Sequence, residues 1–139
     1  MSKKTEELLN ILKENDSFKK YLEENREEMY TGNLPDLLSE LVEKSGMKRI
    51  DAIVAADISE IYGYQIFSGM RRPERGKLLR LAIALRADLD DIQKLLRYAG
   101  YPPLYVRLPA DCVIIYGIVH HMTLEQINDL LLEYEQKPI

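Results

Sequence analysis

Several features that identify large classes of proteins are missing from this chain of 139 residues. A single cysteine, Cys112, excludes an intrachain disulfide and a cysteine-rich zinc site. No apolar run of about eighteen residues occurs, so we expect no transmembrane helix. Charged and polar residues interrupt the segment after the basic start of the chain, so a secretory hydrophobic region is not expected. These absences predict a single-domain cytoplasmic protein of bacterial type.

Motifs for catalysis and metal binding are also missing. The only histidines, His120 and His121, are adjacent, and neighbouring residues on a helix point in different directions, so they form a poor chelate. The carboxylates of Asp90 and Asp91 are explained as favourable charges in the first turn of a helix. No glycine-rich phosphate-binding motif is present. We therefore predict a protein that is not an enzyme and binds no metal or cofactor, with Cys112 as a small buried hydrophobic residue.

No segment alternates polar and apolar residues with the period of a strand, whereas apolar residues recur at helical spacing along most of the chain. The sequence therefore predicts an all-α fold. Helices are expected over residues 5–15, 18–29, 34–45, 48–56, 59–68, 74–85, 88–99 and 110–120, and from 123 onward. The apolar residues predicted to face inward include Phe18, Met29, Val54 and Tyr134.

The predicted helices group into three segments of one compact domain. Residues 1–33 form an N-terminal helical extension, and residues 34–100 form a five-helix bundle. Residues 101–139 contain a proline-rich segment followed by a helical pair packed on the bundle. Prolines at 102, 103 and 109 interrupt any regular helix, so we expect 101–109 to be an extended strap anchored by its apolar side chains.

The chain is organised around two short helices joined by a tight turn near residue 57. Ser59 is a favourable N-cap for the second helix, and Gly69 stands where a left-handed helix terminator is expected. Ile58, Tyr62 and Ile66 share one face by their spacing of four residues. A short helix packed across another through a tight turn is a helix-turn-helix unit. The same logic predicts caps at Asp88 and at the Thr123/Gln126 pair.

The basic residues of this acidic protein are concentrated around that unit. The net charge is −4, yet residues 44–80 carry eight Lys or Arg against four Asp or Glu. An acidic protein can still bind an anionic partner if its basic residues share one surface. A mixed, solvated surface with a local excess of basic residues is the alternative explanation.

The segment Ile66–Pro73, followed by the apolar helix Leu78–Leu85, resembles the lambda-repressor-like helix-turn-helix family, the XRE-type bacterial transcriptional regulators. The shared pattern is an apolar residue, a glycine, a basic loop, a proline and a Leu/Ala-rich helix. It covers about residues 34–96. The resemblance implies a sequence-specific DNA-binding regulator whose 59–68 helix enters the major groove. The chain departs from the family at Asp57, where glycine is usual, and at Gly63, where a branched apolar residue is common.

The resemblance also implies which side chains meet DNA. Base edges would be contacted by Ser59, Glu60, Ile61, Tyr64 and Gln65. Phosphates would be contacted by Lys48, Arg49, Ser68, Arg71, Arg72 and Arg75. Glutamine can bind adenine through two hydrogen bonds, glutamate can accept one from cytosine, and isoleucine can pack on a thymine methyl. Contacts to phosphates would set the register and carry most of the salt-dependent affinity.

A second interpretation is a protein-binding adaptor that uses the same surface without DNA. The 59–68 helix has no lysine or arginine and carries Glu60. Ile61, Tyr62 and Tyr64 would then be apolar anchors, although Tyr62 could equally face the core. Basic residues that converge around the exposed face of this helix would favour DNA. Scattered basic residues beside an apolar or acidic face would favour the adaptor.

We expect a homodimer that places two recognition helices about one DNA turn apart. Either the helices before residue 34 or those after residue 109 would supply the contacts. The second choice is preferred because residues 113–119 are apolar around most of the helix circumference, although a fully buried helix would have the same pattern. No segment is long enough to predict a separate effector domain, and the operator sequence is left open.

Overall fold

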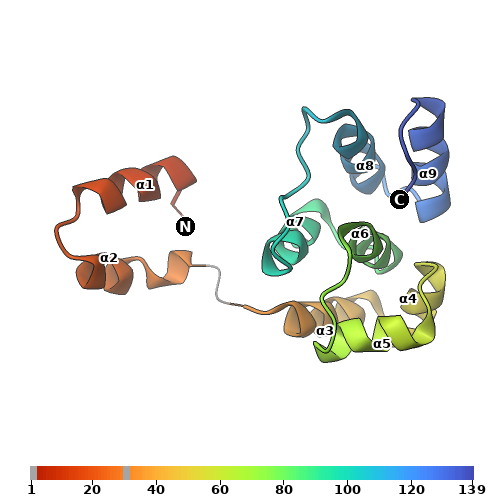
Figure 1. Ribbon diagram of the computed structural model, residues 1–139, viewed down its shortest axis with the longest axis horizontal. Coiled ribbons are helices and arrows are strands. Elements are labelled where there is room, and N and C mark those ends of the chain that lie inside the picture. Colours follow the sequence, from red (N-terminus) through yellow and green to blue (C-terminus); the bar gives the residue numbers. More distant parts are fainter. Residues whose placement is uncertain (1–2, 30–31) are drawn as a thin grey trace. The chain divides into compact units, whose positions relative to one another are not determined.

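A computed structural model describes residues 3–29 and 32–139. Within these residues the chain forms nine α-helices, one 3-10 helix and no strand, which confirms the predicted all-α class (Figure 1). The helices are α1 (Thr5–Glu14), α2 (Phe18–Glu24), the 3-10 helix η1 (Arg26–Glu28), α3 (Leu34–Ser45), α4 (Arg49–Ala55), α5 (Glu60–Ser68), α6 (Arg75–Ala84), α7 (Leu89–Tyr98), α8 (Pro109–Val119) and α9 (Leu124–Glu133). Among the described helices, none has the length and apolar character needed to cross a membrane.

The chain divides into two compact units, Met1–Thr31 and Gly32–Ile139, where the sequence analysis treats it as one domain. In the first unit α1 packs on α2, and Tyr21 is the only buried apolar residue among those described. Phe18 and Met29 were predicted to face inward but are 66% and 45% exposed. Two short helices enclose too little volume to cover these side chains.

The second unit has one continuous apolar core. Helix α3 packs against α5 and α7, and α4 packs against α5 and α6. Leu38, Ile53 and Ile66 from α3, α4 and α5 are fully buried together. The prediction that Val54 is buried is wrong, because its side chain is 69% exposed. On this short helix, the inward positions belong to Ala52, Ile53 and the C-cap residue Ala56, which leaves Val54 pointing outward.

The predicted caps are confirmed and explain where several helices begin and end. The Ser59 hydroxyl accepts a hydrogen bond from the backbone N–H of Tyr62, and Gly69 ends α5 with a φ of 82°. Asp88 caps α7 through the N–H of Asp91 at 2.8 Å. Thr123 and Gln126 form a complete capping box at the start of α9. These local signals fix the boundaries of the elements that surround the candidate site.

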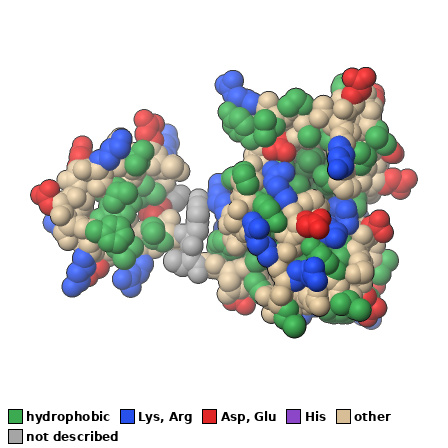
Figure 2. All heavy atoms as spheres, in the orientation of Figure 1, with side chains coloured by type: hydrophobic (Ala, Val, Ile, Leu, Met, Phe, Trp, Pro, Cys, Tyr) green, Lys and Arg blue, Asp and Glu red, His purple; other side chains and the backbone are tan. Residues whose placement is uncertain are grey.

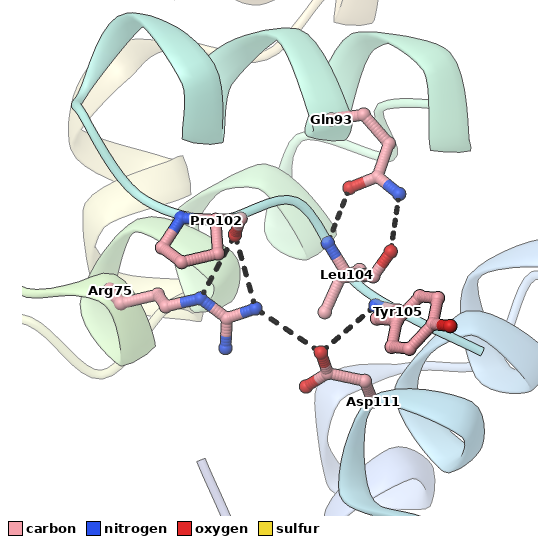
Figure 3. Close-up of polar contacts among 6 residues, drawn as sticks. All are labelled: Arg75, Gln93, Pro102, Leu104, Tyr105 and Asp111. Atoms are coloured by element: carbon pink, nitrogen blue, oxygen red, sulfur yellow. Dashed lines mark hydrogen bonds and ion pairs between the residues drawn. The ribbon is translucent and has the colours of Figure 1, made fainter. Parts of the chain in front are cut away.

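The strap between α7 and α8 is not helical over residues 101–104, as the prolines predict. Its anchoring differs from the prediction. Leu104 is buried, but Tyr105, Val106 and Leu108 are each more than half exposed. Instead, the Gln93 side chain pairs with the backbone of Leu104: the Leu104 N–H donates to Oε1 (2.7 Å), and Nε2 donates to the Leu104 carbonyl (2.9 Å; Figure 3). Polar contacts, together with Leu104 and with Tyr101, which packs against the core, therefore hold the strap.

Helices α8 and α9 pack side by side and rest on the bundle, with α9 against α6 and α8 against α7 (Figure 1). Cys112 was predicted to be buried but is exposed on α8. Tyr134 was predicted to face inward but is 61% exposed, because α9 ends at Glu133. The C-terminal residue Ile139 folds back onto α9, where its N–H and carbonyl bond to the Asn128 side chain at 2.9 and 3.0 Å.

Candidate nucleic-acid interface

Helices α4 and α5 are joined by a tight turn at Asp57. The φ of Asp57 is 55°, in the left-handed region that aspartate adopts more readily than most other non-glycine residues. Arg80 on α6 fixes this turn, with Nε donating to the carbonyl of Ala56 (2.8 Å) and Nη2 donating to the carbonyl of Asp57 (3.0 Å). These bonds hold the turn although it lacks the glycine expected there, and the sequence analysis did not identify Arg80.

A close approach between α4 and α5 depends on Gly63. A Cβ at this position would lie 2.6 Å from side-chain atoms of Ile53 on α4. Ile53 is fully buried and fills the space that a branched residue on α5 would otherwise occupy. Gly63, where the family commonly has a branched apolar residue, is therefore compensated by Ile53 on the neighbouring helix, and α5 stays in contact with α4.

The outer face of α5 brings all five predicted base-contact residues together. They line one open depression with Ser68 and with Met70, which the sequence analysis did not select: Ser59, Glu60, Ile61, Tyr64, Gln65, Ser68 and Met70. Ile61 and Met70 are 73% and 80% exposed, and Tyr64 is 41% exposed. The surface is therefore mainly apolar, with one carboxylate near its N-terminal end.

Gln65 is tied to the basic loop that follows α5. Its Oε1 accepts a hydrogen bond from Nε of Arg71 at 2.9 Å, and its carbonyl accepts one from the Arg71 N–H at 3.2 Å. The amide Nε2 has no such partner among the described residues and stays available as a donor. The Gln65 Oε1 therefore orients the Arg71 guanidinium at the C-terminal end of the depression. The Gln65 amide group can at the same time donate hydrogen bonds outward.

The predicted phosphate-contacting cations do not all lie together. Lys48 is exposed at the start of α4, and Arg49 beside it donates to Ser39 Oγ (3.0 Å) and lies over the ring of Phe67. Arg71 follows the C-terminal end of α5 and lies next to Gln65. Figure 2 shows Lys and Arg side chains gathered over the connection between α5 and α6. Arg49 and Arg71 thus both contact residues in the C-terminal half of α5.

Arg72 and Arg75 turn toward the strap instead. Arg72 Nε donates to the carbonyl of Ala99 at 2.6 Å, and its guanidinium lies over the ring of Tyr101. Arg75 donates to the carbonyl of Pro102 and pairs with Asp111 at 3.4 Å (Figure 3). The Arg75 guanidinium is committed to these internal partners, whereas Arg72 remains an exposed residue.

Asp111 is the partner that the sequence analysis missed. It is 6% exposed, and its Oδ2 accepts from the backbone N–H of Tyr105 at 3.0 Å as well as from Arg75 (Figure 3). A buried carboxylate needs a cation and hydrogen bonds, and Arg75 with Tyr105 supplies both. The sequence shows only an aspartate in the first turn of a helix, which is usually an exposed position.

Tyr62 lies beneath two cations at the edge of this surface. The Arg71 guanidinium is 4.8 Å from its ring centroid, and the Lys77 ammonium is 4.2 Å away. Its hydroxyl accepts a hydrogen bond from the N–H of Glu74 at 3.0 Å. Tyr62 is half-buried and packs against the core, as the core-facing alternative from the sequence expected. Its hydroxyl holds the α5–α6 loop, and the face of its ring contacts the Arg71 and Lys77 cations.

No group of three or more His, Cys, Asp or Glu that could hold a metal ion occurs in the part of the chain that the structure describes. Comparisons with protein-family models, curated proteins and solved structures give no match to this chain.

Proposed function

We propose that this chain is a sequence-specific DNA-binding transcriptional regulator of the lambda-repressor-like helix-turn-helix type. One observation carries the proposal: the outer face of α5 is open, and an exposed cation, Arg71, is hydrogen-bonded to Gln65 on that face. Ser59, with its side chain on the first turn of α5, and Gln65, one and a half turns later, both line that face. This is the arrangement in which a second helix can enter a major groove while neighbouring residues meet the phosphates.

In this proposal the base-reading and phosphate-binding roles fall on different side chains. Glu60 and Gln65 offer an acceptor and a donor to base edges, and Ile61 offers an apolar contact to a thymine methyl. Lys48, Arg49 and Arg71 contact phosphates on either side of the groove, with Ser68 and the exposed part of Arg72 beside them. Arg75 has a structural role, because its guanidinium is paired with Asp111.

We further propose that a second copy of the chain packs on the exposed side of α8, so that two α5 helices reach successive turns of DNA. Apolar residues recur there at helical spacing: Leu108, Cys112, Tyr116 and Val119. The only charged residue of α8, Asp111, is buried. A charge-free face can meet its own copy across a two-fold axis without repulsion. A mass of one chain in light scattering at micromolar concentration would rule this out.

The test of DNA binding is a salt titration with random duplex DNA. We expect the wild type to bind at about 50 mM salt and to weaken steeply toward about 200 mM. Lys48→Ala/Arg71→Ala removes two proposed phosphate contacts and should lower the salt slope by about 2. Lys94→Ala/Arg107→Ala makes the same charge change at exposed residues outside the interface and should leave the slope unchanged. Absence of binding by the folded wild type at low salt would overturn the proposal.

Two observations favour a second function, a protein-binding adaptor: the predicted phosphate-contacting cations do not all lie together, and the α5 face beside them is mainly apolar. The α5 face has no lysine or arginine, and it exposes the apolar side chains of Ile61 and Met70. In that case the wild type should bind no DNA but retain a protein partner. Ile61→Asp should release the partner, whereas Tyr105→Asp, an equal change on the exposed strap, should not. A partner retained by both variants would place the docking surface elsewhere.

A further inference from the structure

A pocket of about 670 Å³ lies where the ends of α4 and α6 meet the turn between α8 and α9. Its floor includes Ile83 and Ile118, each 8% exposed. The space exists because Ala55, Ala84 and Ala87 line it, where larger apolar residues would fill it. Its volume lies within the range of about 300–1,000 Å³ that is usual for sites of small ligands.

Two residues on the rim have an unusual backbone conformation. Arg86 and His121 have φ values of 57° and 56°, in the left-handed region that favours glycine. They are two of only four non-glycine residues with positive φ in the described chain. Each follows the end of a helix, where glycine would terminate the helix with less strain. Non-glycine residues held in this region are concentrated at functional sites.

The arginine on the rim is available to a ligand. Within the described residues, the Arg86 side chain has no hydrogen bond, ion pair or ring contact. Glu125 also lines the pocket but forms no ion pair with it. Thr123, Leu124 and Glu125, at the start of α9, complete the lining of the pocket. The mouth therefore combines a free cation with an apolar interior.

We propose that this pocket binds a small amphipathic carboxylate, with its apolar body against Ile83, Ile118 and Met122 and its carboxylate on Arg86. A planar guanidinium can bind a carboxylate through two hydrogen bonds. The inference goes beyond the proposed function, because binding here requires neither DNA nor a second copy of the chain. It also assigns a ligand site that the sequence did not predict. The sequence analysis found no segment long enough for a separate effector domain and so gave no reason to expect a small-molecule site.

The first test uses the full chain and 8-anilinonaphthalene-1-sulfonate, a fluorescent anion with an apolar body. We expect saturable binding at one site per chain, displaced by decanoate. Decylammonium has the same apolar body with the opposite charge and should compete about tenfold more weakly or not at all, as expected when a charge-assisted hydrogen bond is lost. Equal competition by both amphiphiles, or no saturable binding by the folded chain, would overturn the proposal.

The second test separates binding from folding at Arg86. Arg86→Gly removes the cation and relieves the left-handed strain, so its melting temperature should rise while its affinity for decanoate falls about tenfold. Glu135→Gly relieves the same strain at φ 60° outside the pocket and should leave affinity unchanged. Ala84→Leu should fill the pocket and abolish displacement by decanoate. Unchanged affinity in Arg86→Gly, or in a folded Ala84→Leu, would contradict the assignment.

Discussion

The outer face of α5 and the loop that follows it have opposite chemistry. The helix presents Ile61 and Tyr64 with Glu60, and it contains no lysine or arginine. The loop presents Arg71 and Arg72, each lying over a tyrosine ring. If the chain binds DNA, recognition of bases and attraction to phosphates are thus carried by separate side chains. Changes on the helix should then alter sequence preference, and changes in the loop should alter affinity for any DNA.

The arginines of the α5–α6 loop and of the start of α6 differ in the charge of their partners. Arg71 is exposed, with the neutral side chains of Gln65 and Tyr62 as its partners. Arg75, four residues later, is half-buried and paired with the carboxylate of Asp111. A cation beside neutral partners keeps its charge available to a phosphate, whereas a cation paired with a buried carboxylate does not. The local sequence does not distinguish Arg71 from Arg75, because both are arginines in the same basic segment.

The largest effect is expected from Arg75→Ala. This change leaves the Asp111 carboxylate with the Tyr105 N–H as its remaining partner. The free energy of unfolding should fall by about 2 kcal/mol, less than for a fully buried pair because the Arg75 side chain is 30% exposed. Urea unfolding followed by circular dichroism measures the change.

The matched control for this prediction is Arg71→Ala. Its free energy of unfolding should change by less than about 0.5 kcal/mol, because the side chain is exposed and its hydrogen-bond partner is neutral. Its affinity for random DNA should fall, whereas folded Arg75→Ala should bind DNA like the wild type. Equal destabilisation by both changes would remove the distinction between the two arginines.

Local signals predicted the framework of this fold well. Ser59, Asp88 and Thr123 were identified as helix caps because their hydroxyl or carboxylate groups satisfy backbone N–H groups only two or three residues away. The α6 core positions followed from helical spacing, and Leu78, Leu81 and others on that face are buried. Such interactions depend on short stretches of chain, so the sequence alone contains enough information to predict them.

Contacts between distant segments were not predictable in this way. Arg80 holds a turn 23 and 24 residues earlier, and Asp111 pairs with Arg75 across 36 residues. Nothing near these residues indicates their partners. Val54 and Cys112 were placed in the core on apolar character alone, yet both are exposed, because neighbouring residues take the inward positions. For the candidate site, the sequence predicted the residues on α5 but not which arginines are already paired.

An intermediate effect is expected at Tyr62, where helix and loop meet. Tyr62→Leu removes the ring beneath Arg71 and Lys77, so each cation loses one contact and keeps only its partner Gln65 or Glu74. Affinity for random duplex DNA should fall by about 1 kcal/mol, the scale of exposed cation–π contacts. Tyr62→Phe keeps the ring and loses only the hydrogen bond from the Glu74 N–H, so it should bind DNA nearly as well as the wild type. Equal losses in both variants would assign the effect to the hydroxyl instead.

The smallest effect on random DNA, and the most selective one, is expected at Gln65. Gln65→Ala removes the outward amide donor while Arg71 keeps its stacking on Tyr62, so affinity for random duplexes should change by less than about 0.5 kcal/mol. Selection of binding sites from randomised duplexes should nevertheless recover a different preference at one position, because one base contact is worth about 1–3 kcal/mol of discrimination. Ser17→Ala, at the N-cap of α2 in the other unit, is the control and should leave the selected sequence unchanged. If Gln65→Ala selects the wild-type sequence but binds random DNA more weakly, Gln65 acts only by orienting Arg71, and the separation of base reading from phosphate binding fails at this residue.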